Sequence, residues 1–238
     1  MFKRWFGKQT QEDRQPVVVV SGLPRSGTSM MMKMLDAGGI PVVIDGIRGA
    51  DRDNPKGYYE FERVKQLDKG DTAWVADAQG KAVKVISALL QHLPADQEYR
   101  IIFMERNIDE VMASQRKMMQ NRGEGGNDAG GKDAGGKDAG GKDAGGGVAG
   151  GDTAGDNVAG GEDVPDAEMA ALFARHVEQV EAWMAQQPNV QVLHIDYNAL
   201  LADPAPFVAR LHDFLPFALD TAAMTAVVDP DLYRNRRR

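Results

Sequence analysis

Residues 17–36, VVVVSGLPRSGTSMMMKMLD, decide the fold of this chain. The four valines from Val17 to Val20 predict a strand buried on both faces of a parallel sheet. A turn containing two glycines follows at Gly22–Ser29, and the apolar side chains behind it predict a helix (Met30, Met31, Met34 and Leu35). Such a strand, turn and helix form an anion site, because the first N–H groups of a helix lack intrahelical partners and the helix dipole adds positive charge there.

The turn almost matches the nucleotide-binding pattern GxxxxGK[ST]. Gly22 and Gly27 have the right spacing and Ser29 has the right type, but Thr28 stands where the pattern has Lys. In enzymes that use ATP or GTP, that Lys reaches the β- and γ-phosphates. A loop that lacks it, but carries a cation at Arg25, suits a shorter anion with a differently placed leaving group. Two alternatives remain at this point: a kinase or NTPase with a degenerate loop, and an ordinary turn that binds no ligand.

The stretch Pro24–Ser29 resembles the 5′-phosphosulfate loop of sulfotransferases, which use 3′-phosphoadenosine 5′-phosphosulfate (PAPS). That family carries Pro-Lys/Arg-Ser-Gly-Thr-Thr/Ser in this loop. The resemblance implies that five consecutive residues surround the 5′-phosphate and the sulfuryl group: Arg25, Ser26, Gly27, Thr28 and Ser29.

A second phosphate site is expected at the end of a later strand. Residues 99–106 predict a buried strand, and Asn107 is a good N-cap for the helical stretch 107–119. In sulfotransferases, an Arg at the end of this strand and a Ser eight residues later bind the 3′-phosphate of PAPS. Arg106 and Ser114 have this spacing, and Arg presents paired N–H donors to a phosphate.

Residues 53–60, DNPKGYYE, are similar to a stretch of many bacterial sulfotransferase-like proteins and follow a strand predicted at Pro41–Ile44. The resemblance runs from about Val17 to the C-terminus, apart from one insert. Within it the basic tail supplies Arg234 as a further candidate for the 3′-phosphate.

The catalytic base is where the resemblance weakens. Cytosolic sulfotransferases have Lys-Thr-His at the end of the strand before the 3′-phosphate strand, and this chain keeps only Lys84 there; His92 lies beyond the strand. Heparan and tyrosylprotein sulfotransferases use a Glu instead. We therefore expect Glu60 as the base, with Glu62 and Asp77 in reserve, and Arg25 and Lys84 as catalytic cations.

The composition bounds the class of protein. The 238 residues suit one α/β domain, and the four histidines are scattered without metal-ligand spacing. There are no cysteines, so disulfides and thiolate metal sites are excluded, and a metal-free mechanism is expected. No apolar run approaches the roughly 20 residues that span a membrane.

A low-complexity insert is expected at residues 123–163, where Asp-Ala-Gly-Gly-Lys recurs and 17 of the 27 glycines lie. Such a segment buries too little apolar surface to offset the entropy of ordering it, so we expect a disordered loop that folding does not need. It holds nine acidic residues and three lysines, which accounts for most of the net charge of −7.

The expected organisation is a loosely ordered arm at residues 1–15 and a single domain at 16–238. Strands predicted at 17–21, 41–44, 82–87, 100–105 and 190–195 alternate with helices, among them a long one at 165–187. This indicates a P-loop NTPase-like α/β fold with three layers, α/β/α, around a mostly parallel sheet.

The expected function is a cytoplasmic, PAPS-dependent transfer of a sulfuryl group to a small-molecule, glycan or peptide acceptor, with no metal, nucleic-acid partner or transmembrane segment. The alternatives are a P-loop kinase for a nucleotide or small molecule, and a sulfotransferase-like domain that binds nucleotide but has lost its chemistry.

Overall fold

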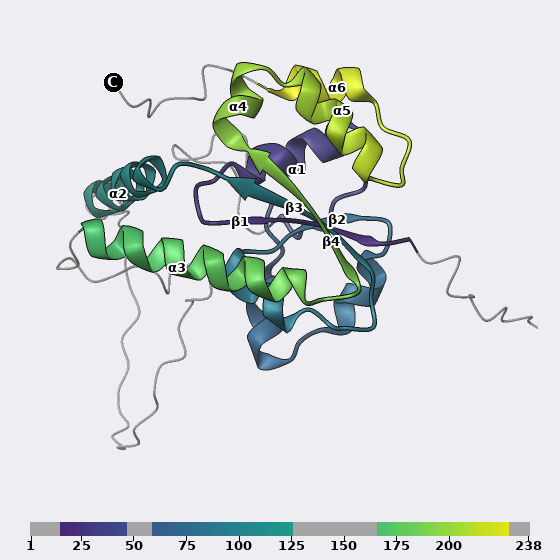
Figure 1. The fold of residues 1–238 in the computed structure, drawn as a ribbon, viewed down its shortest axis with the longest axis horizontal. Helices are drawn as coiled ribbons and strands as arrows, with labels where there is room; N and C mark the ends of the chain where they lie inside the picture. Colours follow the sequence, from purple (N-terminus) through teal and green to yellow (C-terminus); the bar gives the residue numbers. More distant parts are fainter. Residues whose placement is uncertain (1–14, 47–58, 126–165, 229–238) are drawn as a thin grey trace, which may run out of the picture.

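The computed structural model describes residues 15–46, 59–125 and 166–228, and these form three layers. A central sheet is covered on one face by α1, α4, α5 and α6, and on the other by α3 and three 3₁₀ helices (Figure 1). The elements in chain order are β1 (Val17–Gly22), α1 (Thr28–Ala37), η2 (Glu62–Lys69), η3 (Ala73–Ala78), β2 (Ala82–Lys84), η4 (Ser87–His92), β3 (Tyr99–Glu105), α2 (Ile108–Gly125), α3 (Asp166–Ala185), β4 (Val190–Asp196), α4 (Tyr197–Ala202), α5 (Ala205–Phe214) and α6 (Thr221–Val227).

The four valines of β1 show why this segment is central. All of them are fully buried, and successive strand residues point to opposite faces. Val18 and Val20 therefore pack in the core beneath α1 and α5, whereas Val17 and Val19 pack in the core on the α3 side. A strand with two buried faces belongs in the middle of a covered parallel sheet.

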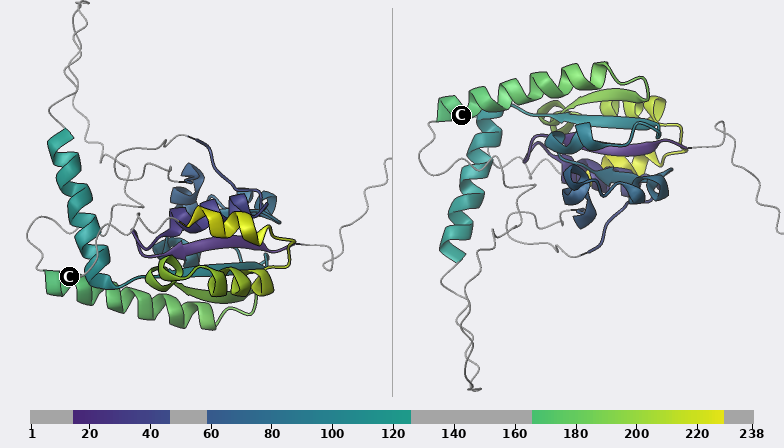
Figure 2. Two further views of the ribbon diagram at one scale, coloured as in Figure 1. Left: turned by 90° about the horizontal axis from the view of Figure 1, so that it is seen from above. Right: turned by 90° about the horizontal axis from the view of Figure 1, so that it is seen from below.

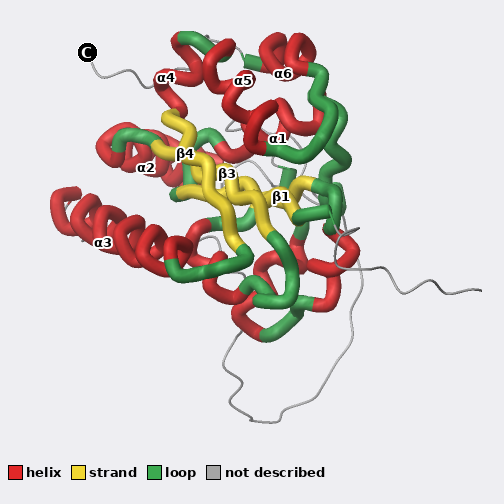
Figure 3. The backbone as a smooth tube through the Cα atoms, turned by 45° about the vertical axis from the view of Figure 1, so that its right-hand side comes forward, coloured by secondary structure: helices red, strands yellow, loops and turns green. Residues whose placement is uncertain are grey.

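The sheet has four strands in the order β2-β1-β3-β4, all parallel, and Figure 3 shows β1, β3 and β4 side by side. Gly22 pairs with Met104, and Glu105 pairs with Asp196, so β1, β3 and β4 end at the same edge. Ligands of open parallel sheets bind outside this carboxyl edge. The three-layer α/β/α fold with a parallel sheet is thus confirmed.

Two strand predictions need correction. Residues 41–44 do not form a strand of the sheet; Val42 makes one isolated bridge to Ala82. Pro41 has no N–H to extend a ladder, and Ile44 is 47% exposed, so this segment only borders β2. The strand predicted at 82–87 ends at Lys84, because the chain turns into η4 at Ser87.

The helices on either side of the predicted insert are present. α2 continues to Gly125, two residues past the predicted start of the insert, and α3 begins at Asp166. Figure 2 shows α2 leaving the carboxyl edge at a steep angle to α3. The rest of the insert and the arm at 1–14 lie outside the described residues. Among the described helices, none combines the length and the apolar character that a membrane span needs.

Candidate anion site at the carboxyl edge

The loop from β1 to α1 is shaped by two glycines with positive φ. Gly22 has φ 144° and Gly27 has φ 96°, values that residues with a side chain rarely adopt. A Cβ at Gly22 would press on the Met104 carbonyl, and one at Gly27 would overlap the ring of Tyr197. The loop can therefore lie close to both β3 and α4.

The loop presents donors to the carboxyl edge. Ser26 is 1% exposed, and its hydroxyl has no hydrogen-bond partner within the described parts of the chain. α1 begins two residues after Ser26, at Thr28, and Ser29 is its second residue. The first turn of this helix, all of which the structure describes, carries no acidic side chain. An unpartnered buried hydroxyl beside the positive end of a helix fits an anion such as a phosphate or sulfuryl group.

Arg25 connects this loop to α2. Its backbone is in the left-handed region, with φ 68°. Its Nε donates to the hydroxyl of Ser114 at 3.1 Å, across 89 residues of sequence. Ser114 is 5% exposed and lies on α2. The loop residue predicted for the 5′-phosphosulfate group thus contacts the serine predicted for the 3′-phosphate.

Arg106 also reaches the loop. It follows β3 directly, and Asn107 caps α2 by accepting from the Asp109 N–H at 2.9 Å. The Nη1 of Arg106 donates to the Arg25 carbonyl at 2.9 Å, and its Nε donates to Glu110 at 3.1 Å. The two predicted phosphate sites therefore share one hydrogen-bonded network.

Tyr197 and Asn198 belong to the same network, although the sequence analysis did not single them out. The Arg106 guanidinium lies 4.7 Å from the centre of the Tyr197 ring, and Asn198 donates to Glu110 at 3.2 Å. Burial raises the pKa of the Tyr197 hydroxyl, while Arg106 and Arg25 oppose that rise. The sequence could have pointed to both residues through their position, because they follow a predicted strand and ligands bind at the carboxyl ends of such strands.

Glu60 and Lys84 form an ion pair beside the end of β2. Their charged atoms are 3.3 Å apart, and both side chains are largely buried. The structure thus brings the expected base and one expected cation together. Glu60 precedes η2 and is not part of its first turn; Glu62 is, and it pairs with Lys65 at 3.0 Å.

The other candidates lie elsewhere. Asp77 is exposed on η3, three residues before Gly80, whose N–H donates to Pro16 at the amino end of β1. His92 is the last residue of η4, beside Gln91. Arg234 and residues 53–58 lie outside the described part of the chain.

A histidine that the sequence analysis passed over lies near the end of β2. His176 of α3 is 2.8 Å from the hydroxyl of Ser87, the first residue of η4. Ser87 is 3% exposed, and burial lowers the pKa of His176. The pair ties α3 to η4, which begins three residues after the end of β2.

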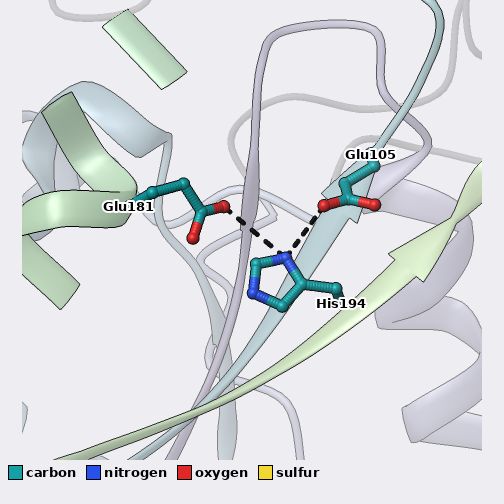
Figure 4. A group of neighbouring side chains, drawn as sticks. All are labelled: Glu105, Glu181 and His194. Carbon is teal, nitrogen blue, oxygen red and sulfur yellow. Dashed lines mark hydrogen bonds and ion pairs between the residues drawn. The ribbon is translucent and has the colours of Figure 1, made fainter. Parts of the chain in front are cut away.

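A mixed-charge cluster marks the ends of β3 and β4 on the α3 side. The Nδ1 of His194 lies 2.9 Å from Glu105 and 3.5 Å from Glu181 (Figure 4). Burial and the neighbouring Glu105 raise the pKa of Glu181, and His194 opposes that rise. All three side chains are more than a third exposed. The cluster is therefore explained as an imidazole that pairs with two solvated carboxylates at the surface.

Comparison with known proteins gives a family and several structural likenesses. A family model for the sulfotransferase domain matches residues 15–232. No curated protein matches the sequence.

Among solved structures, the fold is similar to a sulfotransferase from Mycobacterium tuberculosis H37Rv, with 16% identity, a TM-score of 0.48, and coverage of 89% of this chain and 71% of that one. It is also similar to a sulfotransferase domain from the curacin biosynthetic pathway, with 14% identity, a TM-score of 0.43, and coverage of 94% and 78%. A sugar kinase from Janibacter sp. HTCC2649 is similar at 10% identity and a TM-score of 0.38, over 90% of this chain and 99% of the kinase.

Proposed function

This chain belongs to the sulfotransferase domain family, and we propose that it moves a sulfuryl group from PAPS to a hydroxyl or amine of an acceptor. The observation that carries the proposal is the joining of the two expected phosphate sites. Arg25 contacts Ser114, and Arg106 contacts the backbone of Arg25. A nucleotide with phosphate at both its 5′ and 3′ positions needs two such sites side by side.

The residues present suit that nucleotide. The proposed 5′ site consists of the backbone N–H groups from Gly27 to the start of α1, the buried Ser26 hydroxyl and the Arg25 side chain. Arg106 and Ser114 are proposed to hold the 3′-phosphate. When bound, PAPS supplies the sulfuryl group, whose bond to the 5′-phosphate breaks as its bond to the acceptor forms.

Proton removal from the acceptor is assigned to Glu60. Its carboxylate is oriented by Lys84 at 3.3 Å near the ends of the strands. A base must lie within hydrogen-bond reach of the proton it takes. The two cations, Arg25 and Lys84, are proposed to stabilise negative charge that develops on the transferring group and the leaving phosphate. The acceptor is proposed to be a small molecule, a glycan or a peptide in the cytoplasm.

Calorimetry with three nucleotides tests the proposal. We expect 3′-phosphoadenosine 5′-phosphate (PAP) to bind more tightly than AMP, because only PAP engages Arg106 and Ser114. The Arg106→Lys variant keeps the charge but loses the paired donors, so it should weaken PAP binding and leave AMP binding nearly unchanged. Preference for Mg·ATP over PAP would favour a P-loop kinase and reject the sulfotransferase.

A further inference from the structure

A buried carboxylate lies inside the proposed anion site. Glu110 is 5% exposed, although it belongs to the first turn of α2. Its Oε2 accepts hydrogen bonds from the Nε of Arg106 and from the amide of Asn198. A negative charge beside a phosphate opposes binding electrostatically, so the position of Glu110 calls for a reason other than anion attraction.

The contacts of Arg106 suggest that reason. Its Nε is fixed by Glu110, its Nη1 by the Arg25 carbonyl, and one face of its guanidinium by the Tyr197 ring. A planar guanidinium held at two of its nitrogens and on one face has a single orientation. Arg recognises phosphate through donors of fixed geometry, so its orientation governs how well it binds.

Glu110 also connects separate segments. Through Arg106 it is tied to the loop after β1, and through Asn198 to the junction of β4 and α4. The orientation of the Asn198 amide is fixed, because a flipped amide would place its oxygen against the carboxylate.

We propose that Glu110 is a positioning residue that orients Arg106 toward the 3′-phosphate of the nucleotide. This inference rests on the proposed function, since it assigns a supporting residue to the same site. Glu110 does not touch the nucleotide in this scheme. It fixes the guanidinium plane, and Asn198 in turn holds the Glu110 carboxylate from the start of α4.

The competing electrostatic effect has the opposite sign. If Glu110 acted only through its charge, its removal would make the site more positive and strengthen the binding of PAP. If it acts by position, its removal frees Arg106 to adopt other orientations and weakens PAP binding. The direction of the change therefore separates the two roles.

Three variants make the test. Glu110→Gln removes the charge, and Glu110→Asp keeps the charge but shortens the side chain by one methylene. Asp109→Asn is the matched control, because it removes an exposed acid from the same turn of α2. PAP and AMP affinities are measured by calorimetry on the full chain, with thermal unfolding as a check on the fold.

We expect both Glu110 variants to bind PAP about 10- to 100-fold more weakly, by analogy with the loss seen when the hydrogen-bond partner of a metal ligand is removed. AMP affinity should change little, and Asp109→Asn should resemble the wild type with both nucleotides. Unchanged or tighter PAP binding by Glu110→Gln would overturn the inference. So would equal losses for PAP and AMP, which indicate a general structural role. A wild-type chain that binds neither nucleotide would reject the proposed function, and this inference with it.

Discussion

At the scale of single residues, the assignment of Glu60 as the catalytic base is the one that a single substitution tests most directly. Replacing Glu60 by Gln keeps the size of the side chain but removes its ability to accept a proton. Turnover should fall about 10²- to 10⁴-fold, the usual contribution of a general base, while PAP affinity stays nearly constant. The measurement is a rate with labelled PAPS and an acceptor found in cell extract.

Glu62→Gln is the control for that experiment, because Glu62 lies two residues after Glu60 and its carboxylate pairs with Lys65 at the surface. It should retain the wild-type rate. If Glu60→Gln also retains that rate, the proton leaves by another route, and Glu60 serves only as the partner of Lys84.

Gly27 provides a second test at the residue scale. Gly27→Ala should destabilise the fold, because the new Cβ is strained at φ 96° and overlaps the Tyr197 ring. Gly39→Ala isolates the strain, since Gly39 has φ 95° and a Cβ added there would meet no other atom within 4 Å. Strain alone costs about 1–2 kcal/mol, so chemical denaturation should show a clearly larger loss for Gly27→Ala. Equal losses would mean that α4 moves aside without cost.

At the scale of elements, local pattern sufficed for the strands that pair with a neighbour along their whole length. The strands β1, β3 and β4 and the helices after the loop and after β3 lie within one or two residues of their predicted starts. Prediction failed at the edge of the sheet, where Pro41 and the exposed Ile44 leave a single bridge instead of a strand. Apolar residues predict burial, but not which neighbour will complete a hydrogen-bond ladder.

The candidate site was accessible from the sequence only in part. The resemblance to sulfotransferases singled out Arg25, Arg106 and Ser114, which the structure brings into one hydrogen-bonded network. Tyr197 and His176 were not singled out, because their partners Arg106 and Ser87 are about 90 residues away along the chain. Only the packing of α3 and α4 on the two faces of the sheet brings these side chains to their partners.

The contact between α3 and η4 makes stability depend on pH. Burial lowers the pKa of His176 in the folded state, so the unfolded chain binds a proton more readily. The neutral, buried His176 contributes its full stability above about pH 6.5, the pKa of a histidine in the unfolded chain. That contribution is lost as the pH falls below this value, because the unfolded chain is then protonated first. Denaturation of His176→Gln at pH 7.5 and 5.5 should show a smaller loss on acidification than in the wild type. His212→Gln, an exposed histidine of α5, should behave as the wild type does. An identical acid response in wild type and His176→Gln would contradict this assignment.

At the scale of the whole molecule, the helices α2 and α3 determine how the predicted insert can be removed. α3 packs on the first turns of α2, where Phe173 meets Val111 and Met112. α2 then runs on to Gly125, and its 18 residues span about 27 Å. Figure 2 shows this helix leading away from α3. A replacement segment must therefore return over that distance, which needs at least about eight extended residues.

We propose that residues 126–163 are dispensable for folding, and predict that a linker of about 12 Gly and Ser residues in their place leaves the free energy of unfolding nearly unchanged. Shortening the loop from 38 residues to 12 favours folding by only about 1 kcal/mol, because the closure entropy grows slowly with length. A four-residue linker is the matched control: it cannot span the distance, so it should unwind the end of α2 and lower the thermal midpoint. If the 12-residue variant also loses several degrees, the segment contributes packing that the domain requires.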